Sequence, residues 1–255
     1  KRRSSSEKKQ AIIKKAKRLM IPYFFLTLVT ALLKVVFGAF ARNPLNYSTL
    51  VVDVLIGRNN PNGGLWFLYA LFVIAAFGIL VDAVDRTTLM VVMFALNILN
   101  TFVFQQSGYI VAFFWGYAWI YFMGGVVRKS LYDRLRHSKA LMSAQGIVLI
   151  ATASVGYIIL TFYRIYKVQS WALSTMITII GVLLLFIIAI QIAHNHYGEK
   201  LWMLLGDYGM DIYMIGYYVQ QAIYVVFGKV LGVTYPVYGW LMLIFGLIAP
   251  VVISK

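Results

Sequence analysis

Long apolar runs dominate the chain from Leu19 to its end. A helix needs roughly 20 apolar residues to cross the hydrocarbon core of a membrane, and runs of about that length recur. Residues 181–190 read GVLLLFIIAI and do not alternate between apolar and polar positions, which excludes the strands of a β-barrel. The pattern predicts an all-α polytopic bundle of about eight transmembrane helices, at residues 19–41, 65–81, 88–104, 109–127, 141–163, 171–193, 201–227 and 235–253.

Composition supports this fold class and removes several others. The chain has 255 residues, of which 62% are hydrophobic and 12% are charged. Soluble domains are about 45–50% apolar, and a fold of this size cannot hide such an excess from water. A soluble enzyme and a disordered chain are therefore excluded. The chain has no cysteine, which excludes disulfide scaffolds and metal centres with cysteine ligands.

The net charge of +15 has a topological explanation. With both termini placed inside, the predicted inner segments carry 17 Lys and Arg residues, mostly in 1–18 and 128–140, and the outer segments carry 5; cytoplasmic segments carry such an excess. We therefore expect both termini in the cytoplasm, a basic cytoplasmic segment at 1–18 and a single transmembrane domain at 19–255. Basic residues at the cytoplasmic face also attract anionic lipid. We expect no nucleic-acid partner and, because the three histidines fall in predicted loops, no metal site.

Two basic features suggest an anion site on the cytoplasmic side. Residues 14–23 read KKAKRLMIPY, so a basic run enters the first span through a proline that we expect in its first turn, where a missing N–H is harmless. One interpretation is a charged stop before the membrane; the other is a clamp for the phosphates of a nucleotide coenzyme. Arg128, which follows the glycine pair at 124–125, carries the same two interpretations.

Two further motifs combine aromatic and acidic residues. Trp66 and Tyr69 follow loop glycines at the predicted outer interface, where they form either an aromatic belt or the rim of a cavity that receives a sugar. Asp207 and Asp211 are four residues apart and are expected on one face of the helix at 201–227. Carboxylates within a span are costly, so Asp211 suggests either a functional role or a structural ion pair.

Four of these segments, taken in order, resemble acyltransferase family 3, a family of integral-membrane acyltransferases, and its bacterial O-acetyltransferase type in particular. The matching segments are KRLMIPY at 17–23, LWFL at 65–68, YFMGG at 121–125 and GDYGMDIY at 206–213. The resemblance spans nearly the whole chain. It implies a multi-pass protein of a bacterial plasma membrane.

The resemblance also implies a reaction and a set of roles. An acyl group, commonly acetyl, passes from cytoplasmic acetyl-CoA or another acyl-CoA to a hydroxyl group of an extracytoplasmic carbohydrate or lipid-linked glycan. Lys15, Arg18 and Arg128 are then expected to bind the acyl-CoA phosphates, and Trp66 and Tyr69 to line the acceptor cavity. In the last motif, Asp211 and Tyr213 are expected to orient or brace the site. No permanently bound cofactor is expected.

This chain departs from the family pattern in four places. The family has about ten spans and a catalytic histidine in the first, within an Arg-x10-His pattern that does not occur here, so we expect the first two family spans to lie upstream of Lys1. The family's Arg-x-x-Arg corresponds to Lys15-x-x-Arg18, and lysine loses the bidentate fork of arginine. Family members often have serine at Gly209 and histidine at Gly216. Two alternatives are a transporter or flippase of a lipid-linked glycan and an inactive scaffold.

Overall fold

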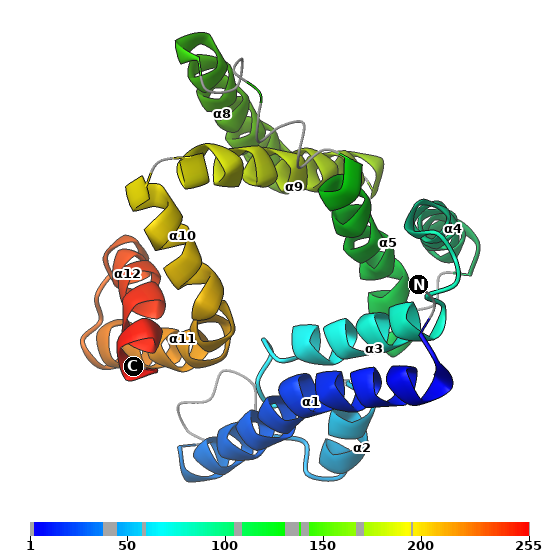
Figure 1. Cartoon of the computed structure of the whole chain (residues 1–255). Coiled ribbons are helices and arrows are strands. Elements are labelled where there is room, and N and C mark those ends of the chain that lie inside the picture. The colour runs from blue at the N-terminus through cyan, green and yellow to red at the C-terminus, as the bar shows by residue number, and fades with distance from the viewer. Residues whose placement is uncertain are drawn as a thin grey trace. The chain divides into compact units, whose positions relative to one another are not determined.

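The computed structural model describes residues 3–37, 45–57, 60–104, 109–130, 138, 143–166, 171–194 and 196–254. These residues form helices and connecting turns and contain no β-strand, which confirms the all-α prediction for this part of the chain. The elements, in order, are α1 (Ser5–Val36), α2 (Leu50–Leu55), α3 (Trp66–Leu80), α4 (Arg86–Leu99), η2 (Asn100–Phe104), α5 (Tyr109–Ser130), α8 (Ala144–Tyr166), α9 (Trp171–His194), α10 (His196–Asp207), α11 (Gly209–Ile223), η3 (Tyr224–Val230) and α12 (Tyr235–Ile253). Figure 1 labels the α-helices along the chain.

Three of the described helices are long and apolar enough to cross a membrane. They comprise Ser5–Val36, Gln145–Arg164 and Trp171–Ile192, and shorter apolar helices occur at Trp66–Leu80, Arg86–Phe102 and Val237–Ile253. The protein is therefore a membrane protein, and the number of spans stays a prediction. The helix positions agree closely with the predicted runs at 65–81, 109–127, 171–193 and 235–253.

The prediction of one continuous helix over 201–227 is wrong, because the helix is broken at Tyr208. The chain ends α10 at Asp207 and begins α11 at Gly209, so Tyr208 separates two helices. Hydropathy averaged over the whole run hides this break, because the short segment GDYG at 206–209 lies between longer apolar stretches. Glycines at 206 and 209 flank it, and glycine is a poor helix former. The histidines also differ from the prediction: His194 ends α9, His196 begins α10, and His137 lies outside the described residues.

Helix α1 begins much earlier than the predicted span. Ser4 caps it through a capping box with Glu7, and the basic run is helical from Ser5 onward. Lys and Arg are good helix formers, so the charged half and the apolar half form one helix of 32 residues. Pro22 consequently lies inside the helix and not in its first turn, and its missing N–H leaves the carbonyl group of Arg18 without its helical donor.

The chain divides into two compact units, Lys1–Val126 with Met210–Lys255, and Val127–Gly209. The single transmembrane domain at 19–255 stays a prediction. In the second unit, α8 packs on α9, and α9 packs on α10. The approach of α8 to α9 is close at Gly181, where an added Cβ would lie 2.6 Å from the hydroxyl oxygen of Tyr157.

In the first unit, α1 and α3 lie side by side (Figure 1). The buried positions of α1 are Leu19, Tyr23, Thr27 and Thr30, which recur every three or four residues and so form one face. Tyr23 packs with Leu65 and Leu68 of the α3 start in a buried cluster. Further residues of α1 and α3 and residues of α2 and α11 pack against it: Met20, Leu26, Tyr69, Val54, Met210, Tyr213 and Met214. This cluster places α1, α3 and α11 next to one another.

Candidate functional site

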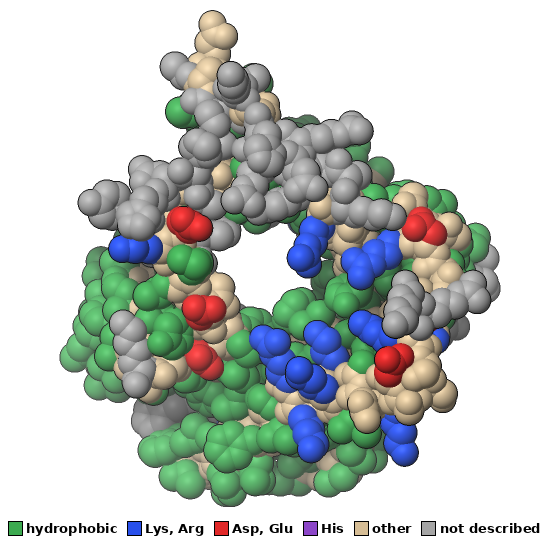
Figure 2. Space-filling model, viewed as in Figure 1, with side chains coloured by type: hydrophobic (Ala, Val, Ile, Leu, Met, Phe, Trp, Pro, Cys, Tyr) green, Lys and Arg blue, Asp and Glu red, His purple; other side chains and the backbone are tan. Residues whose placement is uncertain are grey.

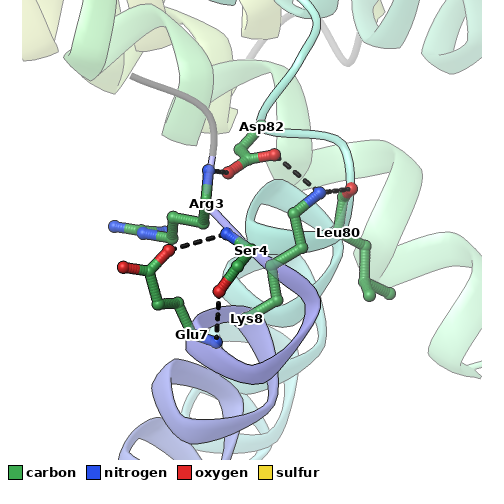
Figure 3. A network of polar contacts seen from close by, with 6 residues as sticks. All are labelled: Arg3, Ser4, Glu7, Lys8, Leu80 and Asp82. Atoms are coloured by element: carbon green, nitrogen blue, oxygen red, sulfur yellow. Dashed lines mark hydrogen bonds and ion pairs between the residues drawn. The ribbon is translucent and has the colours of Figure 1, made fainter.

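The basic N-terminal half of α1 is attached to the end of α3 by a polar network (Figure 3). The ammonium group of Lys8 donates to the carbonyl oxygen of Leu80 at 2.9 Å and pairs with the carboxylate of Asp82 at 2.7 Å. The backbone N–H of Arg3 donates to the same carboxylate at 3.2 Å. A cation next to the last carbonyl groups of a helix is favourable, because the helix dipole is negative there.

Both carboxylates of this network are ionised more easily than usual. The hydrogen bond from Lys8 holds the pKa of Asp82 below its ordinary value. The backbone N–H and the hydroxyl group of Ser4 lower the pKa of Glu7, which is the acidic member of the capping box. The network therefore carries its full charge at neutral pH and fixes the start of α1 against the end of α3.

The other end of α3 meets α1 fifteen residues later, at Tyr23. The Tyr23 ring is fully buried against Leu65 and Leu68, and its hydroxyl group donates to the carbonyl oxygen of Val54 at 2.7 Å. Lys8 lies at the last turn of α3 and Tyr23 at the first, so the two helices run antiparallel along the whole of α3. The basic residues between these two points lie beside α3 and do not extend beyond it.

Lys15 and Arg18 therefore lie along α3, close to the buried cluster. Both side chains are exposed, and their spacing of three residues places them on one side of α1. Lys14 and Lys17 are exposed next to them, whereas Lys9, nine residues before Arg18, projects from the opposite side of the helix. Figure 2 shows Lys and Arg side chains gathered over the surface that α1 forms. The structure thus brings a cationic surface to within about one and a half helical turns of Tyr23.

Tyr69 and Trp66, the predicted cavity residues, both make packing contacts. The Tyr69 ring lies against Gly57, where an added Cβ would be 2.8 Å away, and its hydroxyl group donates to the Leu55 carbonyl oxygen at 3.1 Å. Gly57 has φ of +70°, which only glycine adopts readily. The ring of Trp66 contacts that of Tyr117 in α5 at 5.2 Å between centroids. Tyr69 therefore holds the end of α2, and Trp66 joins α3 to α5.

The motif at 206–213 is divided by the break before α11. Asp207 ends α10, whereas Asp211 lies in the first turn of α11, so the expectation that they share a helical face is wrong. A carboxylate in a first turn is stabilised by the positive end of the helix dipole. The Tyr213 hydroxyl group donates to the backbone carbonyl of Gly64, and its ring packs on that of Phe67 at 5.5 Å. Tyr213 thus braces the loop that precedes α3.

Arg128 is exposed near the end of α5 and falls in the second compact unit. The first unit contains another arginine that the sequence analysis did not select. The guanidinium group of Arg86 lies on Gly125, where an added Cβ would be 2.7 Å from its nearest nitrogen. The glycine of the motif at 121–125 therefore makes room for Arg86.

The loop before α3 carries two further polar residues, half-buried Asn60 and buried Asn62, that the sequence pattern did not single out. Asn60 Nδ2 donates to the hydroxyl group of Thr27 at 2.7 Å, and Asn60 Oδ1 accepts from the backbone N–H of Asn62 at 2.8 Å. Asn62 Oδ1 in turn accepts from the backbone N–H of Gly64 at 3.0 Å. Asparagine followed two residues later by glycine is typical of an Asx-turn, so the sequence NGG at 62–64 could have predicted this turn.

Gly216, one of the departures from the family pattern, has a structural reason. A Cβ at this position would lie 2.8 Å from the backbone carbonyl oxygen of Gly246 in α12. No side chain fits there unless α12 moves, so histidine is excluded by the packing of α11 on α12.

Comparison with known proteins gives one finding of similarity. A family model described as an acyltransferase domain matches residues 1–255. Neither the search of curated proteins nor that of solved structures found a match.

Proposed function

Because the chain belongs to acyltransferase family 3, whose members are membrane acyltransferases, we propose that it moves an acyl group, most simply acetyl, from cytoplasmic acyl-CoA to a hydroxyl group of an extracytoplasmic carbohydrate or lipid-linked glycan. Lys15 and Arg18 bind the phosphates of the donor. Trp66 stands at the acceptor side, and Tyr213 braces the loop that precedes α3. The phosphate contact expected of Arg128, which belongs to the other compact unit, stays a prediction.

One observation carries this proposal. Segments from three of the family motifs meet in the buried cluster: Tyr23 from the first, Leu65 and Leu68 from the second, and Tyr213 from the last. These residues are far apart in the sequence. Their convergence next to the exposed cations of α1 is the arrangement expected of a donor site, since a phosphate group needs cations and an acyl group needs apolar surroundings.

The donor site is tested by binding of radiolabelled acetyl-CoA to the protein in lipid nanodiscs. Arg18→Ala removes a cation from the proposed phosphate surface, and Lys9→Ala removes one from the opposite side of the same helix. We expect about tenfold weaker binding for Arg18→Ala and less than about a twofold change for Lys9→Ala. We also expect binding to weaken as salt rises, because phosphate contacts are screened.

Transfer is tested in membranes that contain the protein, by following label from acetyl-CoA into surface glycan. Equal labelling by wild type and Arg18→Ala would contradict the role of Arg18. Binding of acetyl-CoA without any transfer would favour the inactive scaffold, and absence of both would favour the transporter.

A further inference from the structure

The side-chain amide of Asn62 is buried, and its NH2 group donates no hydrogen bond to the described residues. Its side chain and backbone are together only 1% exposed, and among the residues that the structure describes its Nδ2 atom has no hydrogen-bond partner. The orientation of the amide is defined, because Oδ1 accepts the N–H of Gly64 and the NH2 group must then be at the other position. A buried donor without an acceptor is costly, so proteins retain few of them.

The surrounding contacts hold this amide in one direction. Asn60 receives the backbone N–H of Asn62 and is itself anchored to Thr27 of α1. On the other side, Tyr213 of α11 binds the carbonyl group of Gly64. Contacts with α1 and α11 thus fix the loop. In Asn60 both the oxygen and the NH2 group of the side-chain amide form hydrogen bonds, whereas in Asn62 only the oxygen does so among the described residues.

The unused NH2 group belongs to a residue just before a helix N-terminus, a region where negative charge is stabilised. The Asn62 carbonyl oxygen accepts the N–H of Leu65, the residue that precedes α3, so the amide is one turn before the helix N-terminus. No side chain caps that terminus, and the positive end of a helix dipole favours anions. Leu65 and Leu68 make the neighbourhood apolar, which strengthens any hydrogen bond formed there.

We propose that Asn62 Nδ2 donates a hydrogen bond to the carbonyl oxygen of the transferred acyl group and stabilises the oxyanion that forms on it. This inference rests on the proposed function. In the reaction, the acceptor oxygen bonds to the thioester carbon, the C–S bond breaks, and the hydroxyl proton ends on the coenzyme A thiolate. The oxygen that Asn62 binds is the one that carries negative charge between these two events.

The distance from the cations of α1 suits this assignment. Thr27, which anchors the loop, lies nine residues after Arg18, or about 14 Å along the axis of α1. The phosphates and the thioester of acyl-CoA lie at opposite ends of a long, flexible pantetheine arm. Phosphates at Arg18 and an acyl carbonyl group at Asn62 therefore correspond to the two ends of one molecule.

The test compares the binding of two unreactive donor analogues in nanodiscs. One replaces the thioester sulfur by CH2 and keeps the carbonyl group; the other is an S-ethyl thioether of coenzyme A and has no carbonyl group. Wild type is expected to bind the ketone five- to tenfold more tightly than the thioether, the value of one hydrogen bond. Asn62→Asp keeps the acceptor for Gly64 but loses the donor, and the ratio is expected to fall to about one.

Asn60→Asp is the matched control, because it makes the same chemical change in an amide whose NH2 group is used by Thr27. It is expected to lower the melting temperature and to keep the ratio. Asn62→Ser, which can still accept from the turn, is a second variant if Asn62→Asp does not fold. A ratio that persists in the folded Asn62 variants would overturn this inference alone. If wild type binds neither analogue, the proposed function fails and this inference with it.

Discussion

The hydroxyl group of Tyr213 donates a hydrogen bond to the backbone carbonyl of Gly64, 149 residues earlier in the chain. This bond joins α11 to the loop before α3, and with Tyr23 of α1 it brings three family motifs to one place. Tyr213 of the last motif therefore holds the start of the second motif by a hydrogen bond to the backbone next to it.

Replacing Tyr213 by phenylalanine tests this bond. The ring contact with Phe67 is kept, but the Gly64 carbonyl group loses its donor, and we expect a loss of about 1–2 kcal/mol in the free energy of unfolding. Thermal unfolding in detergent measures the change. Tyr121→Phe removes the same atom from an exposed side chain and is expected to have no measurable effect. Equal melting temperatures for wild type and Tyr213→Phe would contradict the bond's contribution.

Gly216→Ala tests the packing of α11 on α12. The added methyl group would lie 2.8 Å from the carbonyl oxygen of Gly246, which is backbone and cannot turn away. We expect a loss of about 1–3 kcal/mol. Gly124→Ala, a helical position with no described atom within 4 Å, is the control and is expected to be neutral or stabilising by up to about 1 kcal/mol. Similar unfolding curves for both variants would contradict the close approach.

The contact between Lys8 and Asp82 is expected to depend on pH. The pKa of Asp82 is lowered from an ordinary value of 3.8, so the contact is complete at neutral pH and is lost as the pH falls through the lowered value. Spin labels at the exposed positions Lys9 and Val84 report the distance between the helix ends. We expect a narrow distribution at pH 7 that broadens in acid, and a broad one at pH 7 for Asp82→Asn. A narrow distribution for that variant would show that other contacts fix the end of α1.

Pro22→Ala is expected to stabilise α1. The substitution restores an N–H opposite the carbonyl group of Arg18, and proline in a helix interior costs roughly 3 kcal/mol relative to alanine. Helix content and melting temperature are therefore expected to rise. A lower melting temperature would show that a bend at Pro22 is needed for the packing of Tyr23.

Helix positions could largely be predicted from the sequence, because long apolar runs determine them locally. The start of α1 was missed although Ser4 and Glu7 have the spacing of a capping box. The break at Tyr208 was missed although Asp207 and two glycines interrupt the apolar run there. The contacts of the site were not predictable in the same way. The bonds of Asn60 to Thr27 and of Tyr213 to Gly64 depend on which helices become neighbours, and hydropathy carries no information on that.

The antiparallel pairing of α1 with α3 has a consequence for the lipid around the protein. The residues of α1 between Lys8 and Tyr23 are rich in lysine and arginine, yet they run beside a fifteen-residue helix with no charged side chain. Hydrocarbon that enclosed α3 on every side would strip water from these ammonium and guanidinium groups, at a cost of several kcal/mol each. If α3 crosses a bilayer, we therefore expect the lipid to be thinned or wetted along this flank, which would let a water-soluble ligand approach at the depth of α3.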